Sequence, residues 1–176
     1  CQIQYNYMDI EYQAGIKGLK YAADKGLAVV IMEPLRGGRL TKSVPPQVQA
    51  IWDGAPVRRT PADFALQWVW NQPEVSVVLS GMSTMQHVEE NLVSAGRSGV
   101  GTLSEEELAL FAQVREAYQT LSPIPCTDCK YCLPCPNGVN IPRVFEVYND
   151  LMMYGDEHRA HLVYNTFMKA EERADL

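Results

Sequence analysis

Long hydrophobic runs are missing from this 176-residue chain. No window approaches the ~18 consecutive apolar residues of a membrane-spanning helix, so we expect no membrane association. We also expect no secretory signal peptide, because residues 1–5 contain no basic segment that leads into an apolar one. The chain also lacks an initiator methionine and begins in a strand-like sequence. These features predict a fragment of a longer protein.

The chain also has no excess of positive charge. Fifteen Lys and Arg residues stand against twenty-one Asp and Glu residues, and the net charge of −6 is spread evenly along the chain. Nucleic acid is therefore not an expected partner, because a phosphate backbone requires a basic surface. No repeat or low-complexity segment is visible, and 47% of the residues are hydrophobic. This composition predicts a globular protein with a sizeable core.

Three short runs predict β-strands. Residues 2–8 alternate between polar and apolar side chains, whereas residues 27–32 and 75–79 are apolar almost throughout, as in parallel strands covered on both faces. Helical segments separate and follow these runs. They are predicted at residues 12–24 before Gly26, from Thr60 and Pro61 onward, from a capping box of Ser83 and Gln86 through 87–95, and at 104–121, 142–154 and 157–173. The alternation predicts an α/β fold of right-handed β-α units.

Cysteine is scarce except in one stretch. Cys1 stands alone, whereas Cys126, Cys129, Cys132 and Cys135 fall within ten residues. Cysteines so close in sequence are poor long-loop disulfide partners and indicate metal ligation in a reducing, cytoplasmic compartment. The two-residue gaps and the proline after the fourth cysteine favour an iron–sulfur cluster. Zinc and unligated thiols are the alternatives.

The last gap in this cysteine run is one residue shorter than in bacterial ferredoxins. Pro136 also restricts Cys135 to extended backbone conformations. We therefore predict that the first three cysteines bind one cluster, while Cys135 reaches toward a second cluster that this chain does not complete.

Two glycine-containing loops follow the second and third predicted strands. The first contains Gly37 and Gly38 between two arginines, and the second runs from Gly81 into a helix N-terminus. Glycines let backbone N–H groups approach a ligand closely, and a helix N-terminus favours anions. Turn geometry is the favoured explanation for each loop taken alone. Their occurrence on consecutive strands favours a phosphate site.

The chain resembles the C-terminal part of an aldo-keto reductase, in the bacterial and archaeal branch with a ferredoxin-like tail. The most specific stretches are residues 2–6, 30–38, 79–92 and 126–142. The resemblance implies an eight-stranded (β/α)8 TIM barrel in which the three strands are the sixth to the eighth. A whole barrel needs ~250 residues, so more than half of it would lie upstream. We therefore expect the C-terminal part of a barrel at residues 1–122 and a small helical iron–sulfur module at 123–176.

The resemblance also implies a binding site for NAD(P)H without a Rossmann motif. It assigns the nicotinamide end to Gln2 and Met32, with a thioether in place of the usual aromatic ring. It assigns the pyrophosphate to a loop that includes Pro34, Leu35, Gly37, Gly38 and Leu40. The adenosine end falls to Gly81, Ser83, His87, Glu90 and Asn91. Relatives that prefer NADPH carry cations near Gly81 and His87, so NADH is the favoured cofactor here.

The catalytic Asp, Tyr, Lys and His of the family come from strands upstream of this chain. The resemblance therefore implies an oxidoreductase that acts on a small carbonyl compound, with a 4Fe-4S cluster and a redox partner protein, and an inactive fragment. Exposed barrel edges would favour self-association. The alternatives are a non-enzymatic electron-transfer module and a zinc-binding interaction domain.

Overall fold

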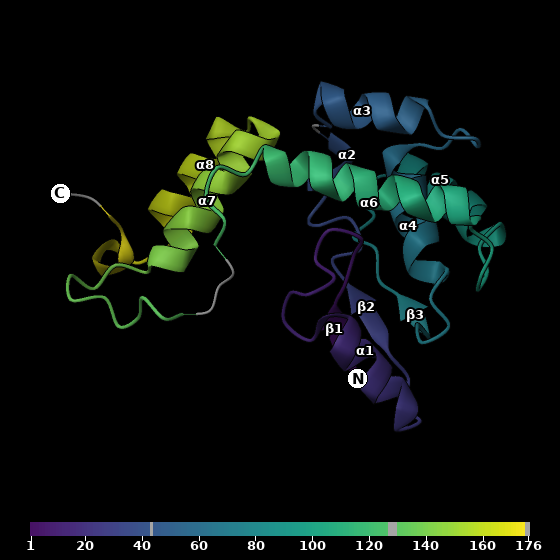
Figure 1. Ribbon diagram of the computed structural model, residues 1–176, viewed down its shortest axis with the longest axis horizontal. Coiled ribbons are helices and arrows are strands. Elements are labelled where there is room, and N and C mark those ends of the chain that lie inside the picture. The colour runs from purple at the N-terminus through teal and green to yellow at the C-terminus, as the bar shows by residue number, and fades with distance from the viewer. Residues whose placement is uncertain (43, 127–129, 175–176) are drawn as a thin grey trace. The chain divides into compact units, whose positions relative to one another are not determined.

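The computed structural model describes residues 1–42, 44–126 and 130–174, and the chain divides into two compact units (Figure 1). The first unit, Cys1–Arg115, contains all the β-strands of the described residues and is called the sheet unit below. The second, Glu116–Leu176, is called the helical unit. None of the helices in the described ranges is both long and apolar enough to cross a membrane.

The sheet unit is built on three parallel strands in the order β1-β2-β3. β1 (Gln2–Gln4) pairs with β2 (Val30–Met32), and β2 pairs with β3 (Val77–Val78). The central strand is apolar because both of its faces are covered, and Ile31 is fully buried. The prediction of parallel β-α units is confirmed.

The strands are shorter than the sequence predicted. The first was expected to reach residue 8 but ends at Gln4, because the Asn6 side chain accepts hydrogen bonds from the N–H groups of Met8 and Asp9 and turns the chain. The second and third begin late, at Val30 and Val77.

Side-chain caps and positive φ angles set several helix starts in the sheet unit. Thr60 accepts a hydrogen bond from the Asp63 N–H before α4 (Pro61–Trp70), as predicted. α1 (Gly15–Asp24) starts three residues later than predicted, because Gln13 and Gly15 adopt positive φ angles. The remaining helices are α2 (Arg39–Lys42), α3 (Pro46–Asp53), α5 (Met85–Gly96) and α6 (Glu105–Thr120), of which α2 and α3 were not predicted. The last turn of α6, from Glu116, belongs to the helical unit.

An aromatic cluster forms the core of the sheet unit. Trp52 stacks on Phe64 with ring centroids 4.2 Å apart, and Phe111 meets both rings edge-on. Tyr5 packs against Trp68 at 5.1 Å. Burial raises the pKa of Tyr5 to about 12, so its hydroxyl stays protonated and the residue serves the core.

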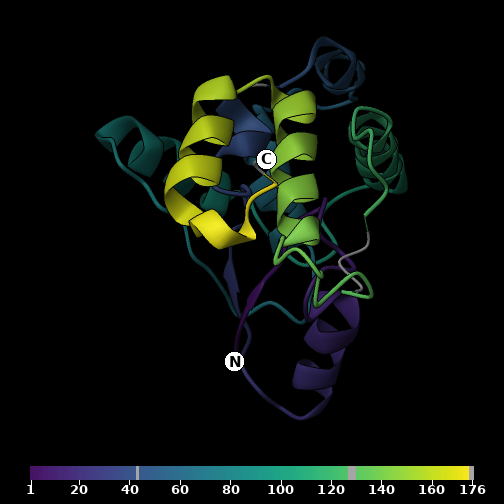
Figure 2. The same cartoon turned by 90° about the vertical axis from the view of Figure 1, so that its left-hand side faces the viewer.

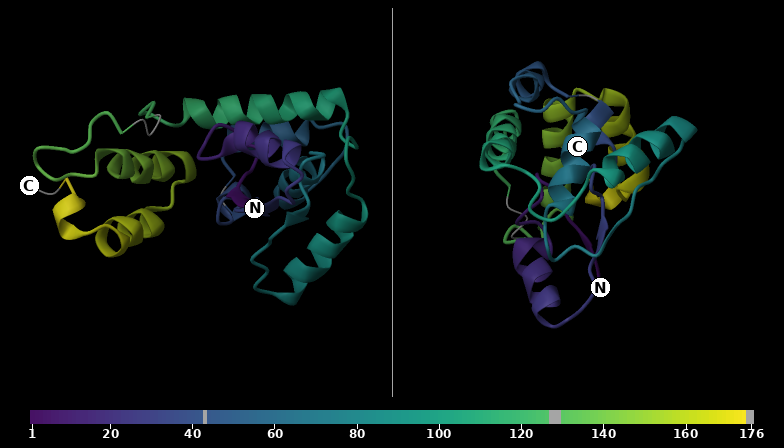
Figure 3. Two further views of the ribbon diagram at one scale, coloured as in Figure 1. Left: turned by 90° about the horizontal axis from the view of Figure 1, so that it is seen from below. Right: turned by 90° about the vertical axis from the view of Figure 1, so that its right-hand side faces the viewer.

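The helical unit is a hairpin of two helical segments. α7 (Ile141–Tyr154) ends at Gly155, whose left-handed backbone (φ 66°) reverses the chain, and α8 (Glu157–Leu162) returns beside it (Figures 2 and 3). The predicted single helix over 157–173 is wrong. α8 continues only through a π-helical turn (Val163–Phe167), and a 3-10 turn (Ala170–Glu172) follows an extended Met168.

Candidate functional site

The carboxyl ends of parallel strands meet at one edge of a sheet, and three loops gather there. They are residues 5–9 after β1, residues 33–38 after β2 and residues 79–84 after β3, and we call them the strand-end loops. Ligand sites of α/β folds lie at this edge.

The loop after β2 has an unusual backbone. Glu33, Arg36, Gly37 and Gly38 all have positive φ angles, of 54°, 51°, 65° and 83°. Two of these residues carry side chains that disfavour this conformation. Such strain persists only where surrounding contacts impose it, and it concentrates at functional sites.

Buried polar contacts impose this backbone. Asn6 is fully buried, and its amide nitrogen donates to the Glu33 carbonyl and to an Asp9 carboxylate oxygen, each at 3.0 Å. The same Asp9 oxygen lies 3.4 Å from Nε of Arg36. The loop after β1 therefore fixes the loop after β2 at both of its strained non-glycine residues.

The predicted pyrophosphate residues differ in accessibility. Pro34 and Leu40 are buried and serve the core, whereas Gly37 is exposed and Leu35 and Gly38 are half-buried. The Gly38 N–H donates to the Leu35 carbonyl at 2.9 Å. The loop is thus a closed turn that presents backbone at the surface.

The strand register separates the two residues predicted for the nicotinamide end. Gln2 pairs with Val30 and is exposed, whereas Met32, half-buried at the end of β2, pairs with Gln4. The Gln4 amide reaches toward the Asp9 carboxylate at 3.4 Å. Gln4 was not singled out from the sequence, although the alternation in residues 2–8 places it on the same face as Gln2.

The helix after β3 begins one residue later than predicted. Thr84, not Ser83, is its N-cap and accepts a hydrogen bond from the His87 N–H at 3.2 Å. Gln86 does not close a capping box, because its amide donates to Glu90 at 2.7 Å. The predicted capping box is therefore wrong.

The adenosine-end candidates lie at the loop after β3 and along α5. Gly81, Ser83, His87 and Glu90 are exposed, and a Cβ atom at Gly81 would meet no other heavy atom within 4 Å. Asn91 is half-buried, and its amide donates to the Ser80 hydroxyl at 3.0 Å, which ties α5 to the end of β3. This surface is open to a ligand.

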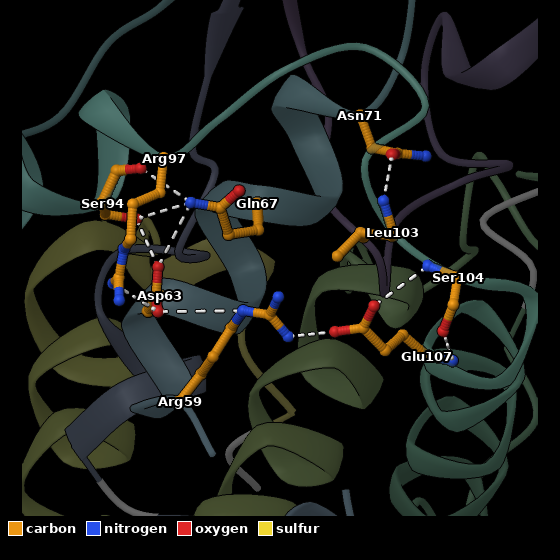
Figure 4. Close-up of polar contacts among 9 residues, drawn as sticks. All are labelled: Arg59, Asp63, Gln67, Asn71, Ser94, Arg97, Leu103, Ser104 and Glu107. Carbon is orange, nitrogen blue, oxygen red and sulfur yellow. Dashed lines mark hydrogen bonds and ion pairs between the residues drawn. The ribbon is translucent and has the colours of Figure 1, made fainter. Parts of the chain in front are cut away.

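A buried carboxylate holds α5 against α4. Asp63 accepts hydrogen bonds from the Ser94 hydroxyl and from Arg97, the latter at 3.0 Å, and Gln67 donates to the Ser94 carbonyl at 2.7 Å (Figure 4). Arg59 lies 3.9 Å from Asp63. No sequence signal marked Asp63 beyond its place in the first turn of a helix.

Arg59 also links this network to α6. Its guanidinium contacts the Glu107 carboxylate, and Glu107 and Ser104 form a reciprocal capping box at the start of α6 (Figure 4). Burial of Glu107 favours a higher pKa, but hydrogen bonds from Ser104 and Arg59 outweigh it and hold its pKa below the ordinary value. The helix with the adenosine-end candidates is thereby locked to two other helices.

The cysteine run is only partly described. Cys126 and Cys132 are exposed free thiols and Cys135 is a half-buried one, whereas Cys129 lies outside the described residues. In the described ranges, no three His, Cys, Asp or Glu side chains gather as a metal site requires. The segment after the run is anchored, because the Asn140 N–H donates to the Glu172 carbonyl at 2.9 Å.

Residues 1–116 match the Aldo/keto reductase family, and the chain belongs to that family. An uncharacterized oxidoreductase of Schizosaccharomyces pombe is 30% identical over 93 residues, which span 52% of this chain and 29% of that protein.

Solved structures show the same fold. The holo form of aldo-keto reductase AKR11C1 from Bacillus halodurans has a TM-score of 0.51 at 19% identity, over 64% of this chain and 41% of that one. Its apo form has a TM-score of 0.50 at 19% identity, over 64% and 42%. The chain thus spans less than half the length of each of these relatives.

Proposed function

We propose that this chain carries the dinucleotide-binding end of an NAD(P)H-dependent oxidoreductase that acts on a small carbonyl compound or its alcohol. Family membership supports the class of reaction. The observation that carries the proposal is the loop after β2, where four residues with positive φ angles lie at the ligand-binding edge of a parallel sheet.

The residues present fit a dinucleotide. The turn at Leu35, Gly37 and Gly38 presents backbone to the pyrophosphate, beside the Arg36 guanidinium. The open space over Gly81 and the exposed first turn of α5 suit the adenosine end. Met32 and the glutamines of β1 would border the nicotinamide. The bound cofactor supplies the hydride, and this chain binds and orients it.

Calorimetric titration of the full-length protein with NADH and NADPH tests the proposal. We expect saturable binding in the usual range of about 1 μM to 1 mM, tighter for NADH, because Gly81 and His87 offer no fixed cation to a 2′-phosphate. Tighter binding of NADPH would reject the NADH preference. No binding of either cofactor would reject the site.

A gain-of-function variant sharpens the NADH preference. Gly81→Arg places a cation in the open space and is expected to improve NADPH affinity about tenfold, the effect of one charge-assisted contact. Gly81→Ala is the matched control, since it changes the backbone freedom and adds no charge. Equal NADPH affinities of the two variants would place the 2′-phosphate elsewhere.

The helical unit is proposed to bind an iron–sulfur cluster through Cys126, Cys129 and Cys132, with Cys135 available to a second cluster. Free thiols at Cys126, Cys132 and Cys135 support this donor set. The cluster would exchange electrons with a redox partner protein. A cytoplasmic location follows from the need for reduced thiols.

Anaerobic reconstitution with iron and sulfide, followed by metal analysis, tests the cluster. We expect Cys126→Ser to abolish iron binding and Cys135→Ser to leave it unchanged. Loss of iron in both variants would show that all four cysteines bind one cluster. Zinc in place of iron would favour the interaction-domain alternative, and iron binding without dinucleotide binding would favour the non-enzymatic electron-transfer module.

A further inference from the structure

We infer that Asn6 is a positioning residue for the loop after β2, and through that loop for the dinucleotide. The inference rests on the proposed function, because it names a residue that acts on the same site. Asn6 itself is fully buried and offers no surface to a ligand.

The Asn6 amide is used completely. Its nitrogen donates to the Glu33 carbonyl and to Asp9 Oδ2, both at 3.0 Å. Its oxygen accepts from the N–H groups of Met8 and Asp9, also at 3.0 Å. A side-chain amide offers two donors and two acceptor positions, and all four are occupied here.

These contacts hold the strained part of the loop. Glu33 has a φ of 54° immediately before Pro34, a position at which a residue with a side chain prefers extended backbone. The Asn6 hydrogen bond fixes the Glu33 carbonyl in that conformation. Through Asp9, which lies 3.4 Å from Nε of Arg36, Asn6 also supports the second strained residue. The preformed loop then needs little reordering when a ligand binds.

The substitution Asn6→Asp separates this role from general packing. It keeps the shape and the acceptor oxygen, but replaces the donor with an oxygen that faces the Glu33 carbonyl and the Asp9 carboxylate. We expect NADH to bind the full-length variant about tenfold more weakly, because a buried hydrogen bond is lost and an acceptor faces two others.

Relief of the strain should rescue binding. Glycine adopts a positive φ without cost, so Glu33→Gly in the Asn6→Asp background is expected to restore most of the NADH affinity. Glu33→Gln is the matched control, since it removes the same charge and keeps the strain. Rescue by glycine alone separates positioning from a charge effect, in the manner of a double-mutant cycle.

A half-buried contact far from the loop after β2 in sequence controls for loss of stability. Asn71 is the C-cap of α4 and precedes β3 in the chain, and its side chain accepts from the Leu103 N–H at 2.9 Å. Asn71→Ala is expected to lower the melting temperature and leave the NADH dissociation constant unchanged. Unchanged NADH affinity in Asn6→Asp, or equal rescue by Glu33→Gly and Glu33→Gln, would overturn the inference.

Hydrogen exchange of the cofactor-free protein tests the positioning role of Asn6 independently of the proposed dinucleotide binding. Asn6→Asp should speed the exchange of residues 35–40, and the added Glu33→Gly should slow it again. If the unaltered protein binds no NADH, the proposed function fails, while the exchange pattern still decides whether Asn6 holds the loop. Equal exchange in all variants would reject the positioning role.

Discussion

The sheet unit and the helical unit are stabilised in different ways. The sheet unit has a cluster of stacked aromatic rings and the buried Asp63 network that locks its helices together. The helical unit has a small apolar core, and a groove of about 230 Å³ stays open between α7 and α8, lined by Val144, Val147, Tyr148, Leu151, Ala160, His161 and Tyr164. Aromatic side chains remain exposed on its surface, among them Phe167.

The two units therefore differ in what is expected to stabilise them: core packing in the sheet unit and a bound metal or cluster in the helical unit. A unit with a dense core folds through its own contacts, whereas a small unit with a shallow core gains most from a bound metal or cluster. Cys126, Cys132 and Cys135 lie in the helical unit, and the strained loop after β2 lies in the sheet unit. A rigid scaffold is what a strained binding loop requires.

The largest expected effect concerns Asp63. Asp63→Ala removes the carboxylate that pairs with Arg59 and Arg97 and accepts from Ser94, and should destabilise the sheet unit by about 3–5 kcal/mol. All three tryptophans lie in the sheet unit, so urea unfolding followed by tryptophan fluorescence reports on it. Asp24→Ala, an exposed position, is the control. Equal unfolding midpoints would show that the network contributes no stability.

Acid should weaken the sheet unit through Glu107. Its pKa is lowered in the folded state, so its contribution is complete above the unfolded pKa, near 4.5, and is lost as the pH falls through the folded pKa. Glu107→Gln should cost about 2 kcal/mol at pH 7 and flatten the loss of stability below pH 4.5. Glu106→Gln, an exposed neighbour, should keep that pH dependence. If stability depended on pH identically in both variants, Glu107 would not be the source of the loss of stability in acid.

Loss of a buried side-chain contact in the helical unit should destabilise that unit alone. Asn149 donates to the Ile124 carbonyl at 2.7 Å and accepts from its N–H at 3.1 Å. Asn149→Ala should lower the protection of α7 against hydrogen exchange by about 1–2 kcal/mol and leave the tryptophan unfolding curve unchanged. Asn165→Ala, at an exposed position, should have no effect. A shifted tryptophan curve would show that the two units unfold together.

The smallest expected effect distinguishes two neighbouring hydroxyls. Thr84→Ala removes the cap of α5 and should raise the exchange rate of its first turn by an amount worth about 1 kcal/mol. Ser83→Ala should leave that exchange unchanged. A larger effect of Ser83→Ala than of Thr84→Ala would show that Ser83 is the N-cap, as the sequence predicted.

Patterns with a local physical cause were read correctly from the sequence. The apolar run at 27–32 places a buried strand at the centre of the sheet, and Thr60 with Pro61 marks the start of α4. Where two hydroxyls compete, as at Ser83 and Thr84, the sequence alone does not choose the cap, and the prediction was wrong by one residue.

Long-range polar contacts were not accessible to sequence patterns. Asn6 and Glu33 are 27 residues apart, and Asp63 meets Ser94 across 31 residues. Contacts between residues so far apart leave no periodic pattern in the sequence. Asn6 and Asp63, which support the candidate site, were therefore not predicted, whereas its glycines were. The strained φ at Glu33 was missed for the same reason, because only a tertiary contact imposes a conformation that the side chain disfavours.

Hydrogen exchange of the full-length protein with and without saturating NADH tests most directly whether the strand-end loops bind the dinucleotide. We predict slower exchange at residues 35–40 after β2 and at 81–91 from the loop after β3 into α5, with no change in α7 and α8 of the helical unit. Protection confined to the helical unit, or no protection at the loops after β2 and β3 while NADH is bound, would contradict this prediction.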